Sequence, residues 1–361
     1  MNRDLLELYS DYLLSSFSYT TATGLSAMTG GVVSHDKISR FLAEEELNSP
    51  KLWRLVKPLV RELEDGEGVL IIDDTIEEKP YTDESELVCW HYDHSKGTNV
   101  KGINLLSTLY QVGDASIPVA FQLVKKTQWA YDKKKGKWHR KSAKTKNELY
   151  RRMLRACKKN RIDFRYVLND VWYASSENMA YIKGDLEKEF IMPIKTNRKV
   201  ALSLQEKQRG EYEQVGSLRL EPGTVREVYV EKVEFPLLLV KQVFKNEDGS
   251  EGILYLVSSD LTLDYERLTT IYQRRWKVEE YHKSLKVNAS LAKSPTKTIR
   301  TQSNHCFASI YAFMKLERMK LATKMNHFAL RSRMYLKAAQ AAFQELQSLR
   351  LPGAEFGWCV R

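Results

Sequence analysis

Cysteine is scarce in this sequence, and its few cysteines are not spaced as ligands. The 361 residues include only four of them and no C-x-x-C pair: Cys89, Cys157, Cys306 and Cys359. Zinc modules and disulfide-stabilised secreted domains depend on closely spaced cysteines, so the sequence fits neither class. Free cysteines fit a protein of the reducing cytosol. The seven histidines also lack ligand spacing beyond one pair that flanks a loop: His91 and His94.

Long apolar runs and internal repeats are missing as well. The first residues, MNRDLLELYSDYLL, contain acids and no long apolar core, so we expect neither a signal peptide nor a membrane span. The length suffices for two or three domains with a large core.

Acidic residues are fewer than basic ones, 46 against 57, which gives a formal net charge of +11. This excess favours a polyanionic partner. It is strongest in residues 125–159, where fifteen Lys or Arg occur with two acids and the aromatic residues Trp129, Tyr131 and Trp138. One interpretation is a loop along DNA phosphates with its rings against sugars or bases. The other is a solvated loop without a partner.

The most informative segment is 272–286, YQRRWKVEEYHKSLK, which predicts a single helix. At about 100° per residue, Tyr272, Arg275, Glu279 and Lys286 would lie within roughly 60° of one another. An apolar stripe runs beside them: Ile271, Val278 and Leu285. The alternative is a solvated amphipathic helix with an i,i+4 ion pair between Arg275 and Glu279.

The spacing Y-x2-R-x3-E-x6-K resembles the signature of the insertion-sequence-four type of DDE transposases, the hairpin-forming cut-and-paste enzymes. Trp276 and the following EYHK (280–283) also look like that family. The resemblance implies that Glu279 is a catalytic, metal-binding acid. It further implies DNA contacts by four residues of this helix: Tyr272, Arg275, His282 and Lys286. Arginine suits a bidentate grip on phosphate, and lysine supplies a point charge.

Two further acids that the resemblance requires follow short apolar strands. Residues 69–72 (VLII) precede Asp73, Asp74 and Thr75, and residues 165–169 precede Asp170. An unbroken apolar run predicts a strand buried on both faces. In the family the first aspartate directly precedes a threonine, so the role passes to Asp74 and not to Asp73. The second passes to Asp170. Taken singly, either acid would also suit a turn or a helix cap.

Three gathered carboxylates imply cations between them, because like charges repel. Two Mg²⁺ or Mn²⁺ ions about 4 Å apart would activate water or a DNA 3′-hydroxyl and stabilise the leaving oxygen. Lys79, five residues after Asp74, is predicted to reach a phosphate near these metals.

Residues 1–62 are predicted to form a helical DNA-binding domain. Two short helices joined at Gly30–Gly31 suggest a helix-turn-helix, with Ser34 capping the helix over 36–47. His35, Lys37 and Arg40 would then face DNA. The alternative is a helical bundle with only structural contacts.

The predicted fold class is α/β: a ribonuclease-H-like catalytic core with a β-strand insertion, plus the N-terminal helical domain. The core would comprise 63–195 and 261–323, interrupted by a β-rich insertion at 196–260, with a helical tail at 324–361. The elements expected in its first part are strands 68–73, 101–112 and 116–124, helix 147–159, the Asp170 strand, helix 176–189 and strand 190–195. A turn at Gly113–Asp114 would join two of the strands. The base-flipping aromatic that the family carries in its insertion has four indistinguishable candidates: Tyr212, Tyr229, Phe235 and Phe244.

Three functions follow. The first is a cut-and-paste transposase that cleaves transposon ends and transfers the strands into target DNA. The second is a DNA endonuclease of the same fold without strand transfer, and the third is a transposase-derived DNA-binding protein without chemistry. The intact acids argue against the third. By resemblance, the partners would be double-stranded DNA, both terminal inverted repeats and target, and a second copy in a homodimeric synaptic complex. The expected setting is the prokaryotic cytoplasm, associated with the nucleoid and not with a membrane.

Overall fold

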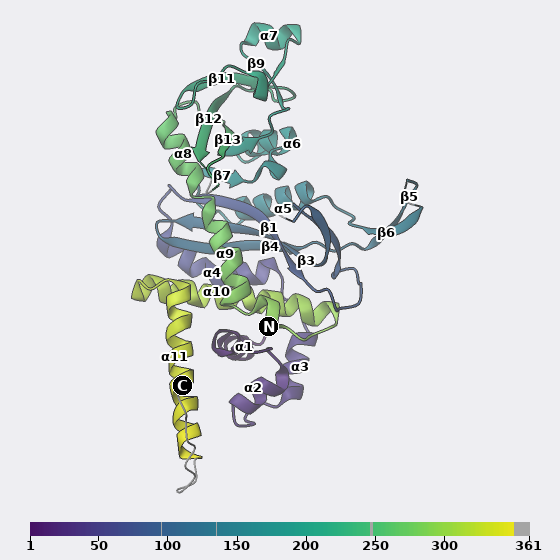
Figure 1. The fold of residues 1–361 in the computed structure, drawn as a ribbon, viewed down its shortest axis with the longest axis vertical. Helices are drawn as coiled ribbons and strands as arrows, with labels where there is room; N and C mark the ends of the chain where they lie inside the picture. Colours follow the sequence, from purple (N-terminus) through teal and green to yellow (C-terminus); the bar gives the residue numbers. More distant parts are fainter. Residues whose placement is uncertain (95, 135, 246–247, 350–361) are drawn as a thin grey trace, which may run out of the picture.

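The computed structural model describes residues 1–94, 96–134, 136–245 and 248–349. An eleven-stranded mixed sheet runs through it in the order β10-β9-β11-β12-β13-β8-β7-β1-β3-β2, with β4 beside β3. Figure 1 shows this sheet with helices packed around it. The sheet strands are β1 (Val69–Glu78), β2 (Cys89–Asp93), β3 (Thr98–Val112), β4 (Ala115–Leu123), β7 (Tyr166–Asn169), β8 (Glu189–Ile194), β9 (Lys199–Ala201), β10 (Glu213–Gln214), β11 (Val225–Val230), β12 (Leu237–Lys245) and β13 (Glu251–Ser258).

The centre of the sheet follows the predicted order of elements. Strands β1, β3 and β4 form an antiparallel meander, helix α5 (Lys146–Lys159) follows, and β7 returns parallel to β1. Strand β8 then adds parallel to β7. The apolar run 69–72 is fully buried, as expected for a strand covered on both faces. This mixed α/β arrangement is compatible with a ribonuclease-H-like fold.

Strand β1 is longer than the predicted 68–73, so the two aspartates lie within it and not at its end. Its pairing with β7 stops at Ile72 opposite Asn169, but its pairing with β3 continues to Glu78 opposite Gly102. The longer partner keeps the backbone of β1 extended. Asp73 and Asp74 therefore lie just beyond the point where β1 stops pairing with β7, in a part of β1 that still pairs with β3.

The basic segment 125–159 is not the continuous loop that its composition suggested. It forms a separate hairpin of β5 (Gln128–Asp132) and β6 (Lys137–Lys141), followed by α5. Cross-strand pairs explain the hairpin: Arg140 lies over the Trp129 ring at 4.5 Å, and Tyr131 and Trp138 pack at 5.4 Å. The hairpin projects from the side of the sheet (Figure 1).

The predicted insertion continues the central sheet. Strand β13 pairs with β8, β12 pairs with β13, and β11 pairs with β12. A short helix, α7 (Leu204–Arg209), lies between β9 and β10. The helix predicted at 176–189 is shorter, with α6 (Ser176–Ala180) and one wide turn to Asp185. Glu187 then takes a positive φ of 56°, which ends the helical path.

The first four helices are α1 (Arg3–Ser15), α2 (Ala22–Met28), α3 (His35–Ala43) and α4 (Ser49–Leu63). Ser34 caps α3 as predicted, although α3 ends before residue 47. Helices α1 and α3 pack against α10 (Ile299–Thr323), where the Tyr9 hydroxyl lies 3.0 Å from His305 Nδ1. Their apolar residues join one hydrophobic core with those of the sheet.

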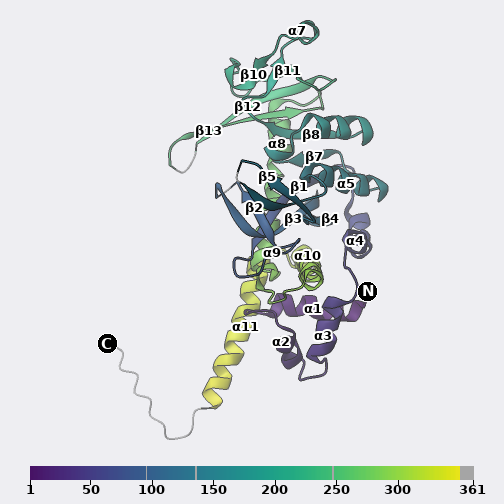
Figure 2. The same cartoon turned by 90° about the vertical axis from the view of Figure 1, so that its right-hand side faces the viewer.

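The remaining helices are α8 (Tyr265–Gln273), α9 (Trp276–Val287) and α11 (His327–Ser348). Figure 2 shows α11 extending away from the sheet. Among the described residues, no helix is both long and apolar enough to cross a membrane. The end of the predicted tail, 350–361, lies outside the described residues.

Candidate active site

A cleft of about 430 Å³ opens where β1 and β7 meet α9. It brings together all three acids predicted from the sequence. The side chains that line it are mostly acidic, basic or aromatic: Asp73, Asp74, Thr75, Ile76, Tyr92, Asp93, His94, Lys146, Asp170, Trp172, Tyr173, Glu279, His282, Lys283 and Lys286.

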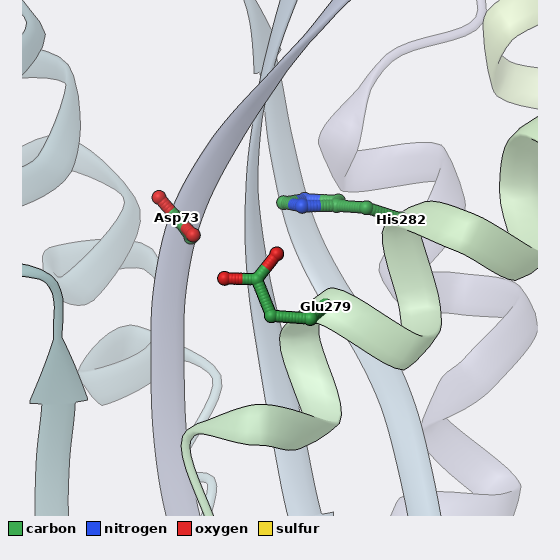
Figure 3. Close-up of side chains that lie close together, drawn as sticks. All are labelled: Asp73, Glu279 and His282. Atoms are coloured by element: carbon green, nitrogen blue, oxygen red, sulfur yellow. The ribbon is translucent and has the colours of Figure 1, made fainter. Parts of the chain in front are cut away.

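Asp73 is the aspartate of β1 that faces α9. One carboxylate oxygen of Asp73, one of Glu279 and a ring nitrogen of His282 lie within 4.8 Å of one another. Figure 3 shows these three side chains converging from the strand and the helix. The parallel register, Ile72 opposite Asn169, also places Asp73 level with Asp170. Asp73 thus shares the cleft with both other acids, whose charges act on it.

The environment of Asp73 strongly disfavours its charge. Burial raises the pKa of this carboxyl to about 8, and the negative charges of Asp74, Glu279 and Asp170 act in the same direction. The repulsion between these carboxylates favours the protonated form of Asp73. A divalent ion removes that repulsion, so a carboxyl of this kind binds a cation readily.

Asp74, the residue preferred from the sequence, lines the same cleft but is held by protein partners. Its carboxylate accepts hydrogen bonds from Lys146 Nζ at 2.7 Å and Asn104 Nδ2 at 2.6 Å, and from the Tyr173 hydroxyl. Burial alone would raise the pKa of Asp74, but the nearby Lys146 ammonium and these hydrogen bonds hold it below its usual value. Successive strand residues point to opposite faces, so the two aspartates have different neighbours.

Asp170 directly follows β7 and forms the second acidic wall of the cleft. One of its oxygens, Oδ1, accepts the backbone N–H of Val171 at 2.7 Å, which orients the carboxylate at the start of a short 3-10 turn. Its charge contributes to the raised pKa of Asp73. The predicted position of Asp170 beside the first acid is therefore found.

The predicted single helix over 272–286 is wrong, because two helices meet there. Helix α8 ends at Gln273, and α9 begins at Trp276 after a tight turn. The turn directs Arg274 onto the backbone carbonyls of Glu67 and Gln111, at 3.0 and 2.8 Å. Helix α8 packs on β8, whereas α9 packs on β1, so one straight helix would not satisfy both contacts.

The cations and the phenol of the signature lie around Glu279 but make separate contacts. Arg275 Nη1 lies 3.1 Å from Glu279 Oε1, and Lys286 Nζ donates to the Ile76 carbonyl at 2.8 Å. The Tyr272 hydroxyl is buried, 3.5 Å from the Asn169 carbonyl. Lys286 lines the cleft, whereas Lys79 does not and instead donates to the Ala292 carbonyl at 3.2 Å.

His282 was assigned to DNA on the basis of the resemblance, and the structure places it against the acids. It lies one helical turn after Glu279, is 6% exposed, and burial lowers its pKa to about 3. No described residue hydrogen-bonds its Nε2. Its spacing from Glu279, i and i+3 on one helix, was the sequence signal for this pairing.

The N-terminal and insertion candidates lie elsewhere. Lys37 and Arg40 are exposed on α3, which Figure 1 shows beyond α10 from the sheet. The four base-flipping candidates in the insertion do not line the cleft. Aromatic residues at the cleft come instead from β2 and the β7 end, where His94 packs against Tyr92 at 4.8 Å and Trp172 at 4.5 Å. No motif marked these rings in the sequence.

The donor set fits hard or borderline divalent cations. Asp73, Asp170 and Glu279 offer carboxylate oxygens, and His282 adds a buried nitrogen that no described residue hydrogen-bonds. Without a cation, the buried carboxylate of Asp73 would be expensive to keep charged beside these acids.

Comparison with known proteins places the chain in a family. No curated protein matches the sequence. The family model described as DDE superfamily endonuclease matches residues 1–231, which include both β1 aspartates and Asp170 but not Glu279. That match spans more than half of the 361 residues, and enzymes of this superfamily are metal-dependent nucleases and transposases that act on DNA. The chain therefore belongs to the DDE superfamily endonucleases.

Proposed function

We propose that this protein is a cut-and-paste DNA transposase of the insertion-sequence-four type. It would cleave transposon ends in a metal-dependent reaction and join the freed 3′ ends to target DNA. The observation that carries this proposal is the convergence of Asp73, Asp170 and Glu279 in one cleft bordered by lysines and exposed rings. The family match supports the nuclease chemistry.

Asp73, Asp170 and Glu279 would hold two divalent cations, Mg²⁺ or Mn²⁺. Such ions supply an activated oxygen nucleophile and stabilise the leaving oxygen of an in-line displacement. Asp74 was the first acid predicted from the sequence, but its ion pair with Lys146 favours its neighbour as the ligand. Asp74 would then orient Lys146, Asn104 and Tyr173 around the site.

Arg275 and Lys286 would hold the phosphates of the strand that is cut. Arg275 is fixed beside Glu279 by their 3.1 Å contact, so its guanidinium is already close to the metal-binding acids. When DNA binds, a phosphate would accept hydrogen bonds from the N–H groups of Arg275 that Glu279 does not occupy. Trp172, which is 45% exposed, would pack against a sugar or base at the rim.

A second basic surface would bind DNA outside the cleft. The β5–β6 hairpin exposes Trp129, Tyr131 and Trp138 beside several lysines. Rings and ammonium groups on a projecting hairpin suit a nucleic-acid backbone. On α3, Lys37 and Arg40 would contact the terminal inverted repeat, and two copies of the chain would pair the two ends as a homodimer.

An endonuclease of the same fold is the second candidate, because the same acids would hydrolyse DNA without joining it. The family match favours neither one, since it describes an endonuclease superfamily. A DNA-binding role without chemistry is disfavoured by the intact acids.

The test uses the full chain, Mg²⁺ and labelled duplexes that carry the inverted repeats flanking the gene, with a supercoiled target plasmid. Nicking at the repeat boundary followed by joining of the labelled 3′ end to the plasmid is expected. Specific cleavage without joined product would assign the endonuclease instead. No cleavage by the wild type under conditions in which it binds the end would refute both.

A further inference from the structure

We propose that His282 supplies a metal ligand, so that the ion held by Asp73 and Glu279 has one nitrogen donor and the site prefers Mn²⁺ to Mg²⁺. The inference rests on the proposed function, since it concerns the same cleft. It goes beyond that function because an imidazole ligand selects among divalent ions, whereas three carboxylates alone would not.

The first support is the position of the ring. One His282 nitrogen and one oxygen from each of Asp73 and Glu279 lie within 4.8 Å of one another, close enough for a single ion between them. Glu279 and His282 are three residues apart on α9, which directs both side chains toward β1, as Figure 3 shows.

The second support is an unmet hydrogen-bonding group. His282 is 6% exposed, and its Nε2 is buried with no hydrogen-bond partner among the described residues. A buried polar atom without a partner is destabilising, so such atoms are uncommon in folded proteins. With Nε2 as the ligand atom, a bound ion would satisfy this nitrogen.

Another buried histidine of the core, His305, shows what a structural role looks like here. It is 1% exposed, and both of its ring nitrogens have partners: the Tyr9 hydroxyl at 3.0 Å and the Ser290 carbonyl at 3.0 Å. Within the described chain, nothing comparable holds the Nε2 of His282. A plain packing role would leave this atom of His282 without a partner, as a few other buried polar atoms of the described chain are.

The chemistry of the donor predicts the choice of ion. Mg²⁺ strongly prefers oxygen ligands and near-ideal octahedral geometry, whereas first-row transition metals also accept imidazole. Two carboxylates and one imidazole thus favour Mn²⁺ among the ions that support this kind of phosphoryl transfer.

The test is pulsed electron paramagnetic resonance of Mn²⁺ bound to the full chain. A ¹⁴N coupling typical of a directly bound imidazole is expected, and labelling the histidines with ¹⁵N should replace it with a ¹⁵N coupling. His282→Gln should abolish the signal. His94→Gln is the matched control, because His94 lines the same cleft but lies outside the group of three, and its coupling should persist.

Calorimetry with Mn²⁺ and then Mg²⁺ measures the selectivity. His282→Gln should weaken Mn²⁺ binding about tenfold or more and change Mg²⁺ binding about threefold or less, since the glutamine oxygen still serves a hard ion. If this variant does not fold, as judged by circular dichroism, the wild-type and His94→Gln spectra decide the question.

Wild-type protein that binds Mn²⁺ without a nitrogen coupling, or whose coupling survives in folded His282→Gln, would overturn the inference. DNA cleavage in Mg²⁺ is measured separately. Cleavage without a nitrogen coupling would support the proposed function and refute the histidine ligand. A coupling without cleavage would support the histidine ligand and refute the proposed function.

Discussion

Lys146 Nζ lies 2.7 Å from a carboxylate oxygen of Asp74, in an ion pair that joins the first turn of α5 to the middle of β1. The pair is largely shielded from water, and Asn104 donates to the same carboxylate oxygen. Asp74 is therefore already neutralised by protein groups, whereas the Asp73 carboxylate accepts the backbone N–H of Asp74 and lies beside Glu279 and His282 without an ion pair among the described residues. This difference between adjacent residues leads to the first prediction.

Replacing Asp73 by Asn should reduce Mg²⁺-dependent DNA cleavage by more than about 100-fold, because it removes a metal ligand. A residue that only positions a ligand is expected to cost roughly 100-fold at most. Asp74→Asn should cost about 10–100-fold, because it loosens Lys146 without removing a ligand. Single-turnover cleavage of a labelled end measures both. Binding of the end should remain in each variant. The reverse order of the two effects would restore Asp74 as the ligand.

The same Asp73→Asn change should stabilise the metal-free protein at pH 8. The pKa of Asp73 in the fold is raised to about 8, above its ordinary value near 4, so its contribution to stability is present at low pH and is lost as pH rises from about 4 to 8. Removing the charge should increase the free energy of unfolding in urea titrations, by at most about 5 kcal/mol, the value that a shift of about four pKa units corresponds to. The exposed Asp83→Asn variant is the control and should show little change. Equal stability of wild type and Asp73→Asn at pH 8 would contradict the raised pKa.

Arg275→Ala should weaken cleavage-competent DNA binding more than metal binding. One charge-assisted hydrogen bond to phosphate contributes about 1.5 kcal/mol, which corresponds to about a tenfold loss of affinity. Arg275→Lys should recover only part of it, because an ammonium does not reproduce the bidentate fork. Gel-shift titrations and Mn²⁺ calorimetry separate the two effects. Near-normal end binding and cleavage in the alanine variant would reduce Arg275 to a helix ion pair with Glu279.

Stability should fall below pH 6.5 partly through His305. Burial lowers the pKa of His305 in the fold to about 4, while the unfolded value is near 6.5. Its contribution is thus complete above pH 6.5 and is lost as pH falls toward 4, which amounts to about 2 kcal/mol at pH 5. Urea titrations at pH 7 and pH 5 should show a smaller pH effect in His305→Gln than in wild type. His35→Gln, an exposed histidine on α3, should behave as wild type.

Lys37→Ala and Arg40→Ala should each weaken binding to the inverted repeat. Each should also reduce the slope of log affinity against log salt concentration by about one, because one cationic side chain no longer neutralises a phosphate. Point variants are preferable to a deletion of residues 1–62, because α1 shares a core with α10 and its removal would expose apolar side chains. Fluorescence anisotropy over a range of salt concentrations measures the slope. Unchanged slopes in both variants would leave α3 with a structural role only.

Local patterns in the sequence were enough to place most elements of the fold. The apolar run at 69–72, the Gly113–Asp114 turn and the Ser34 cap all lie where they were predicted, because each depends on neighbours along the chain. The helical register placed Arg275 against Glu279 and brought Glu279 and Lys286 into one cleft, despite the break before Trp276. Local patterns together with the family resemblance therefore predicted that Asp170 and Glu279 share one cleft with the aspartates of β1.

The tertiary structure decided what depends on partners distant in the sequence. Whether Asp73 or Asp74 meets Glu279 is set by how α9 lies across β1, and a resemblance based on the following threonine does not contain that information. The break between α8 and α9 arises from their packing on different strands. His282 became a candidate ligand only when burial left its Nε2 without a partner in the described chain. The sequence by itself determined which acidic, basic and aromatic residues are available to the site. The packing of α9 on β1 decided that Asp73 and not Asp74 lies beside Glu279 and His282, because a change of one position along a strand turns a side chain to the opposite face.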